Sequence, residues 1–228
     1  MVRIFKKLNG SFNAEVKRLW RKERPNPTPK PIPFGVKLFK SSLSATFSRQ
    51  SAEFIAKSQK GQAIYEYVRD ARTGNCPDES FWVTVTGNQG IIDMPGGFNG
   101  TKFLKMTKKA QHKRKLRTGI DAEKSDYYIS RYQLWRNHWR ENCTGRLVSD
   151  SCAFGVRDIV WLLKKPHLVA HKFHFKTQPA AYFCIYKKVR ERALDNNWTF
   201  DDKMYGDLPG PRMTRGQSVQ EWFDKNAS

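Results

Sequence analysis

The sequence of 228 residues lacks the two features that usually take a chain into the secretory pathway. No apolar run approaches the roughly 18 residues that a membrane-spanning helix needs. The first residues, MVRIFKKLNGSF, lack the apolar core of a signal peptide. Taken alone, these absences predict a chain with no route of its own into that pathway.

Motifs for metals, phosphates and nucleic acids are also missing. No Cys-x-x-Cys pair is present, which argues against a structural zinc site. The Gly-rich stretch 87–100 has neither a GxGxxG nor a GxxxxGK pattern, so it predicts turns and no phosphate-cradling loop. No RNP, KH, zinc-finger or helix-turn-helix signature occurs. Charge is therefore the only feature that suggests nucleic-acid binding.

Acidic residues are scarce, with 21 Asp and Glu against 42 Lys and Arg and a net charge of +21. Such a surface attracts polyanions or anionic membranes and says little about the fold. Residues 102–117 hold eight Lys and Arg and no acid. We favour a solvated, mobile loop for this run, with a patch for nucleic acid, acidic glycans or lipid head groups as the alternatives.

The remaining composition predicts a globular chain of one large domain or two small ones, since 39% of residues are hydrophobic and 13% aromatic. Strand-like and helix-like stretches mix, so the expected class is α/β. Residues 36–49 suit a strand pair. Residues 196–228 are predicted to be a polar, loosely ordered tail. Helices are expected over 51–70, 125–138, 156–165 and 180–194.

Two positive features favour a secretory history. Asn-x-Ser/Thr sequons are more frequent than composition predicts, at Asn9, Asn99, Asn142, Asn197 and Asn226. Cys143 and Cys152 lie nine residues apart, a separation that suits a small disulfide loop, although free buried thiols are an equal alternative from spacing alone. Cys76 and Cys184 have no evident mates.

The stretch CPDESFW, residues 76–82, is the most informative local pattern. Pro77 suits the first position of a helix, and Asp78 and Glu79 then fall in the first turn, where the helix dipole favours anions. A strand is the competing interpretation, because VTVT follows. We favour the helix, with Phe81 and Trp82 on its buried side. On this evidence alone, Glu79 is an ordinary first-turn acid.

Several segments in order resemble one enzyme family. Together they are similar to the C-terminal half of the core-2/I-branching β-1,6-N-acetylglucosaminyltransferases, the branch-type glycosyltransferases that also include peptide O-xylosyltransferases. The resemblance covers residues 1–195. The matching segments are LNGSFNAE, LFKSSLSATFSR, CPDESFWVTVTGNQGIIDMPG, YQLW, C-x8-CAFGVRDIVWLLKKPHLVAHKF and CIYKKVRERAL.

The resemblance implies a GT-A-like glycosyltransferase domain of which residues 1–195 are the C-terminal, acceptor-side part, with a mixed sheet flanked by helices. It implies a Golgi enzyme on the lumenal side of the membrane, held by an N-terminal anchor that this chain lacks. The expected partners are a UDP-sugar donor, N-acetylglucosamine more often than xylose, and a glycan acceptor. Inversion at the anomeric carbon is expected, with no cofactor, no metal and no nucleic acid.

The resemblance assigns catalysis to Glu79, which occupies the position of the family's catalytic base. An acceptor hydroxyl must lose its proton as it attacks the anomeric carbon, and a positioned carboxylate accepts that proton. Aromatic neighbours raise the basicity of a carboxylate by desolvation. Asp78 remains a first-turn acid.

On the donor side, Lys172 of VAHKF matches a family lysine at the diphosphate, and it is expected to share a cleft with Glu79. Fixed cations neutralise a leaving diphosphate where no metal does so. The family places an arginine three residues before the second cysteine of its small loop, but this chain has Ser149 there. Weaker donor binding is therefore expected, with Arg146 and Arg157 as possible substitutes.

On the acceptor side, Tyr132 and Trp135 of RYQLW lie where the family keeps aromatic residues that contact the sugar. Core packing is an equal alternative for Trp135. Near LNGSFNAE, plausible further contacts are Glu15, Lys17 and Arg18. The resemblance also implies a Cys143–Cys152 disulfide.

Two alternatives to a transferase remain open from the sequence. The chain could be a non-catalytic remnant of the family that binds glycans or a partner. A basic nucleic-acid-binding protein is the other alternative, and it rests on charge alone.

Overall fold

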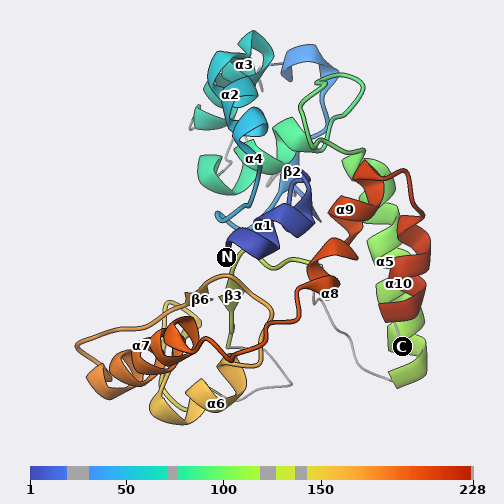
Figure 1. Cartoon of the computed structure of the whole chain (residues 1–228). Helices are drawn as coiled ribbons and strands as arrows, with labels where there is room; N and C mark the ends of the chain where they lie inside the picture. Colours follow the sequence, from blue (N-terminus) through green and yellow to red (C-terminus); the bar gives the residue numbers. More distant parts are fainter. Residues whose placement is uncertain (20–30, 71–75, 119–126, 137–142, 227–228) are drawn as a thin grey trace. The chain divides into compact units, whose positions relative to one another are not determined.

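A computed structural model describes residues 1–19, 31–70, 76–118, 127–136 and 143–226 (Figure 1). The chain divides into two compact units, each with its own core. Unit 1 comprises residues 1–128 and 202–228, and unit 2 comprises residues 129–201. Within the described ranges, no helix has both the length and the apolar character that crossing a bilayer requires.

The described residues of unit 1 are largely helical and contain one two-stranded antiparallel sheet, in which Lys17 lies opposite Lys40. The predicted strand pair within 36–49 is wrong, because this segment pairs with residues near the N-terminus instead. The elements are α1 Val2–Leu8, β1 Lys17–Arg18, η1 Pro33–Gly35, β2 Phe39–Lys40, α2 Arg49–Lys57, α3 Gln59–Arg69, α4 Pro77–Thr86, α5 Gly100–Thr118, α8 Lys203–Gly206, α9 Pro209–Thr214 and α10 Val219–Asn226.

The core of unit 1 forms where α3 packs on α4. Ile64, Val68 and Val85 are completely buried there. The helix predicted over 51–70 is in fact two helices, because the chain is extended at Ser58 and its hydroxyl accepts the backbone N–H of Gly61 at 3.1 Å. Ser58 thus ends α2 and caps α3, as an N-terminal serine commonly does.

The basic run 102–117 forms part of α5, so the expected mobile loop is wrong. Phe103 anchors this helix, since its ring is 3% exposed and contacts Phe98, Tyr127 and Phe223 at centroid distances of 5.3, 4.9 and 5.6 Å. Figure 1 shows α5 and α10 side by side. The apolar face of α5 therefore holds the helix in place despite its charge.

The expected loose tail over 196–228 differs from the structure, which places α8, α9 and α10 at residues 203–226. Trp222 and Phe223 of α10 are 6% and 5% exposed. The few apolar residues of this polar segment sit at helical spacing, so they bury one face although the overall composition is hydrophilic.

Unit 2 is built on two short pairs of strands, one of which is a disulfide-linked hairpin. The parallel strands β3 and β6 pair Tyr132 with Ala170, and the antiparallel hairpin β4–β5 joins them through the N–H of Cys152, which donates to Leu134 O at 2.8 Å. Unit 2 therefore holds one parallel and one antiparallel two-stranded sheet among its described residues, and both are very short. The elements are β3 Tyr132–Gln133, β4 Arg146–Val148, β5 Ser151–Ala153, η3 Val156–Asp158, α6 Ile159–Leu162, β6 Ala170–His171 and α7 Pro179–Leu194.

The helix predicted over 125–138 is wrong for the described part of that range, 127–136. The N–H of Tyr132 donates to Val169 O at 2.7 Å, so this segment is held as a strand by a partner far along the chain. Tertiary pairing overrides the local helical pattern here. The helix expected over 180–194 is confirmed as α7, which begins at Pro179.

Candidate functional site

Glu79 lies in the first turn of α4, as the CPDESFW pattern predicts. Pro77 is the first helical residue, and Cys76 is the N-cap without a side-chain capping bond. The side chain of Glu79 is 31% exposed, whereas Asp78 is an exposed residue. The two adjacent acids therefore differ in environment, and Glu79 is the one held partly inside the protein.

Strand β2 holds the Glu79 turn through backbone and side-chain contacts. Lys40 Nζ lies 2.8 Å from Glu79 Oε2, and the N–H of Ser41 donates to Glu79 O at 2.7 Å. Further along α4, the hydroxyl of Thr84 accepts the N–H of Phe39 at 3.1 Å. The hydrogen bond from Lys40 to Glu79 is the main cause that raises the pKa of the Lys40 ammonium, against a smaller opposing effect of burial.

The charged row continues from Lys40 into β1. Lys17 lies opposite Lys40 in the ladder, and its Nζ lies 3.1 Å from Glu15 Oε1. Glu15 also contributes to the raised pKa of Lys40. The structure therefore brings Glu15, a plausible acceptor contact from the sequence, into the electrostatic surroundings of the Glu79 pair.

An aromatic stack lies beside the Glu79 turn. Trp82 follows Glu79 by three residues, which places both on one side of α4. Its ring stacks on Phe47 at 5.4 Å, and Phe47 stacks on Phe12 at 5.5 Å. Trp82 is half-buried. Phe81 is buried as well, so the predicted buried side of this helix is confirmed, with Trp82 at its edge.

Two buried hydroxyl groups flank the ion pair in sequence. Ser41 follows Lys40 and Ser80 follows Glu79, with exposures of 3% and 0%. Neither hydroxyl has a hydrogen-bond partner within the described part of the chain. Buried polar groups in folded proteins are nearly always paired with protein atoms or with ordered water.

In unit 2, Cys143 and Cys152 form a disulfide with their Cα atoms 5.6 Å apart, in agreement with the pairing that the resemblance implies. Asp158, completely buried, accepts the N–H of Thr144 at 3.1 Å and that of Gly155 at 2.8 Å. Its carboxylate thus ties both flanks of the hairpin to η3. Asp158 was not singled out by the sequence, because its two partners come from different segments.

Lys172 pairs through its backbone with β5, and its ammonium reaches the turn of the same hairpin. Its Nζ donates to Val148 O at 2.8 Å, directly before the turn Ser149–Asp150. Both turn residues have left-handed φ angles, 47° and 58°, as a two-residue hairpin turn requires. Arg136 pairs with Asp150, Nε to Oδ1, at 2.9 Å. The structure therefore brings Lys172 next to the Ser149 position and adds Arg136, which sequence analysis missed.

The two predicted acceptor aromatics have different surroundings. Tyr132 is 3% exposed and packs against Phe154, Trp161 and His167, with the ring of His167 nearest at 4.9 Å. This burial speaks against the expected contact of Tyr132 with an acceptor, since no sugar reaches a core ring. Trp135 is 51% exposed, so core packing does not account for it.

His171 precedes Lys172 and lies in a cationic setting. Burial is the main cause that lowers the pKa of its imidazole, and the nearby charges of Arg131, Lys172 and His174 act in the same direction. The segment around Lys172 therefore disfavours additional positive charge and attracts anions.

Among the described residues, one group of potential metal ligands lies close together, namely Cys143, Cys152 and Asp158. The two sulfur atoms are bonded to each other, so neither is a thiolate ligand. The expectation of a metal-free site stays a prediction.

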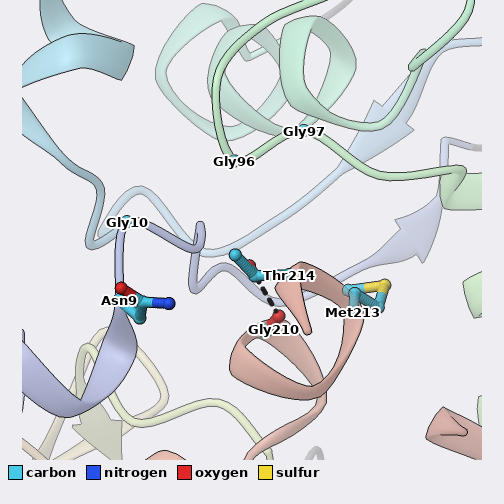
Figure 2. Close-up of a pocket in the computed structure, with 7 residues that line it drawn as sticks. All are labelled: Asn9, Gly10, Gly96, Gly97, Gly210, Met213 and Thr214. Carbon is cyan, nitrogen blue, oxygen red and sulfur yellow. Dashed lines mark hydrogen bonds between the residues drawn. The ribbon is translucent and has the colours of Figure 1, made fainter. Parts of the chain in front are cut away.

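A separate cavity of about 230 Å³ lies in unit 1 and does not include Glu79 (Figure 2). Glycines form it, and a Cβ on Gly96 would overlap the carbonyl oxygen of Gly10. No ionisable side chain lines it, so it offers no acid or base. Its lining residues are Asn9, Gly10, Gly96, Gly97, Gly210, Met213 and Thr214.

Comparison with known proteins bears on these features. No family model matches the chain. The human enzyme named beta-1,3-galactosyl-O-glycosyl-glycoprotein beta-1,6-N-acetylglucosaminyltransferase is 27% identical over 171 residues, which are 72% of this chain and 35% of that enzyme. The mouse N-acetyllactosaminide beta-1,6-N-acetylglucosaminyl-transferase is 25% identical over 168 residues, 73% of this chain and 35% of the mouse protein. The resemblance to the core-2/I-branching transferases is confirmed.

The chain spans about a third of the length of these branching transferases. A mouse relative, beta-1,3-galactosyl-O-glycosyl-glycoprotein beta-1,6-N-acetylglucosaminyltransferase 4, shows the same proportions, with 26% identity over 70% of this chain and 30% of that protein. The roles of Glu79, Lys172 and Trp135 stay predictions. Glu79 lies in unit 1 and Lys172 in unit 2, and their shared cleft stays a prediction.

Proposed function

We propose that this chain functions as part of a Golgi glycosyltransferase that moves N-acetylglucosamine from a UDP-sugar to a hydroxyl of a glycan acceptor, with Glu79 as the catalytic base. The observation that carries the proposal is the setting of Glu79, a half-buried carboxylate held from one side by Lys40 and placed beside Trp82. The similarity to the N-acetylglucosaminyltransferases supports N-acetylglucosamine as the transferred sugar. In this proposal, residues 1–195 form the acceptor side of the GT-A-like domain.

The proposed reaction is a single displacement with inversion. The acceptor hydroxyl gives its proton to the Glu79 carboxylate while its oxygen attacks the anomeric carbon from the face opposite the nucleotide. The bond between that carbon and the diphosphate oxygen breaks, and UDP leaves with the bonding electrons. Lys40 occupies Oε2 of Glu79, which leaves Oε1 to accept the proton.

The donor diphosphate is proposed to meet Lys172. An ammonium has three donors and Val148 O takes one of them, so two N–H groups remain for phosphate oxygens. Ser149 adds no charge at the tip of the hairpin, and Arg136 is engaged by Asp150. Donor binding is therefore proposed to be weaker than in a relative with an arginine at the Ser149 position. No step of this scheme uses a metal.

The acceptor is proposed to be a β-1,3-galactosyl O-glycan or an N-acetyllactosamine chain, as the relatives' names state for those enzymes. Pyranose faces stack on exposed aromatic rings, and Trp135 presents such a ring. Tyr132 supports the strand from within the core.

The Cys143–Cys152 disulfide supports a lumenal location, because structural disulfides persist in the oxidising compartments of the secretory pathway. Four of the sequon asparagines are exposed, as N-glycosylation requires, namely Asn9, Asn99, Asn197 and Asn226.

The proposal is tested by joining the chain to the donor-side part of the human branching transferase, producing the fusion in the secretory pathway of cultured cells, and incubating it with UDP-N-acetylglucosamine and a β-1,3-galactosyl O-glycan. We expect a glycan heavier by one N-acetylglucosamine in mass spectra, with and without EDTA. Acceptor binding is measured in parallel by ligand-observed NMR. Binding without transfer would make the chain a glycan-binding protein. The absence of both binding and transfer would contradict the proposal altogether.

A further inference from the structure

The exposed side of α5 carries an unbroken row of cations. Phe103, Thr107 and Ala110 form the buried side of the helix, where they face α10 and the neighbouring loops. At 100° per residue, the exposed cations fall within an arc of about 160° opposite that side. They are Lys102, Lys105, Lys108, Lys109, Lys113 and Lys115.

Most of this charge is uncompensated within the protein. Lys113 Nζ lies 2.6 Å from Asp224 Oδ1 at the edge shared with α10. Lys102, Lys105 and Lys108 form no ion pair within the described part of the chain, and Lys109 has only the long-range field of Asp224. Like charges three and four residues apart destabilise a helix. The core contacts of Phe103 hold a helix whose outer side repels itself, and a bound polyanion would relieve that repulsion.

The structure disfavours a membrane as the occupant. An interfacial helix needs an apolar face for the lipid, and the apolar face of α5 is already buried in the protein. Leu116 is the single large apolar side chain that is fully exposed on α5 among its described residues. The contact would rest on charge alone.

Nucleic acid is disfavoured on two grounds. The exposed side carries no Phe, Tyr or Trp ring for base stacking, because Phe103 of α5 is in the core. The Cys143–Cys152 disulfide indicates an oxidising compartment, where the polyanions within reach are acidic glycans. We propose that the exposed face of α5 binds an acidic polysaccharide, a sulfated glycan chain, along the row of lysines.

This second carbohydrate site is separate from the Glu79 turn and does not rest on the proposed transfer reaction. Lys102 and Lys115 are thirteen residues apart, so the row extends for about 20 Å along the helix. A flexible linear polyanion can follow a row of that length. Binding is expected to weaken steeply with salt, because it releases counterions.

Heparin is the probe for the test, with the whole chain titrated against the fluorescein-labelled polymer at several salt concentrations. The variant replaces Lys102, Lys105, Lys108 and Lys109 by glutamine. We expect its heparin affinity to fall at least about tenfold and its salt dependence to flatten. A control variant with the same net charge replaces exposed lysines outside α5, and it should stay within about threefold of the wild type. These are Lys6, Lys37, Lys57 and Lys176.

Thermal unfolding and circular dichroism show that both variants are folded before affinity is compared. Equal losses in the two variants would overturn the proposal, because net charge alone would then explain binding. Two further probes are an RNA oligonucleotide and phosphatidylserine vesicles. If the α5 substitutions lowered the affinity for RNA or for the vesicles more than the affinity for heparin, the proposal would also be overturned. The occupant would then be a nucleic acid or a membrane.

Discussion

Lys40 Nζ lies 2.8 Å from Glu79 Oε2 and joins a strand to a helix that begins 37 residues later in the chain. The pair is partly shielded, since the side chains are 45% and 31% exposed. The N–H of Ser41 fixes the backbone of the same turn. A proton acceptor must be held in one orientation to act in catalysis, and this pair supplies a physical cause for that orientation.

A double-mutant cycle with Lys40→Met and Glu79→Gln measures the pair. At about pH 7.5 we expect a coupling of about 0.2–1 kcal/mol in the free energy of unfolding, since both side chains are partly solvated. The pKa of Lys40 is raised above its usual 10.5 in the folded chain. The stabilisation is therefore complete below about pH 10.5 and disappears as pH rises through the folded pKa. Urea titrations in alkaline buffers check this, and a coupling independent of pH up to complete lysine deprotonation would refute it.

The disulfide should stabilise unit 2. Replacing Cys143 and Cys152 by serine removes the constraint on a short loop, and we expect a loss of about 2–3 kcal/mol in the free energy of unfolding. The matched control replaces the exposed, unpaired Cys76 and Cys184 by serine and should change stability by less than about 0.5 kcal/mol. Equal effects in chemical denaturation would show that the disulfide has no special role.

The C-terminal helices should be part of the folded unit. Phe223→Ala removes a ring that contacts Phe103 at 5.6 Å and Tyr127 at 6.1 Å, so we expect a loss of about 3–5 kcal/mol. Lys225→Ala, at an exposed position on the same helix, is the control and should be nearly neutral. A loose tail would give two neutral variants in thermal and urea unfolding.

Acid should weaken unit 2 through His171. Its folded pKa lies below the usual 6.5, so the unfolded chain binds a proton that the folded chain does not. Stability should therefore fall as pH drops below about 6.5, and His171→Gln should reduce that fall. The exposed His112 on α5, changed to glutamine, is the control. Parallel stability curves for wild type and His171→Gln between about pH 7.5 and 5 would rule out this cause.

The sequence predicts elements whose determinants are local. Pro77 with two acids behind it specifies the start of α4, and Pro179 followed by a long helical pattern specifies α7. The break between α2 and α3 depends on the hydroxyl of Ser58, which caps α3. The apolar repeat continues across Ser58, so the sequence pattern does not reveal the break. Boundaries of this kind are weak in any periodic pattern.

The elements that the sequence misplaced depend on distant partners. RYQLW has a helical pattern but becomes β3, because backbone groups near Ala170 and Cys152 pair with it. Residues 203–226 are polar in composition, and their helices fold because α10 packs on α5 through Phe223. At the site, Glu79 was found from CPDESFW, whereas Lys40 was missed because its contact crosses from β2 to α4. Local patterns therefore identified the acid and not the residue that holds it.

The turnover number of Glu79→Gln, beside that of Asp78→Asn, tests the central claim most directly. Both substitutions exchange a carboxylate for an amide of the same shape, and Asp78 is the exposed neighbour in the same turn. The account predicts that Glu79→Gln lowers the turnover of N-acetylglucosamine transfer by about two orders of magnitude or more, with acceptor affinity unchanged within about twofold, while Asp78→Asn keeps normal turnover. Full turnover by Glu79→Gln would contradict the account and leave Glu79 as a first-turn acid of α4.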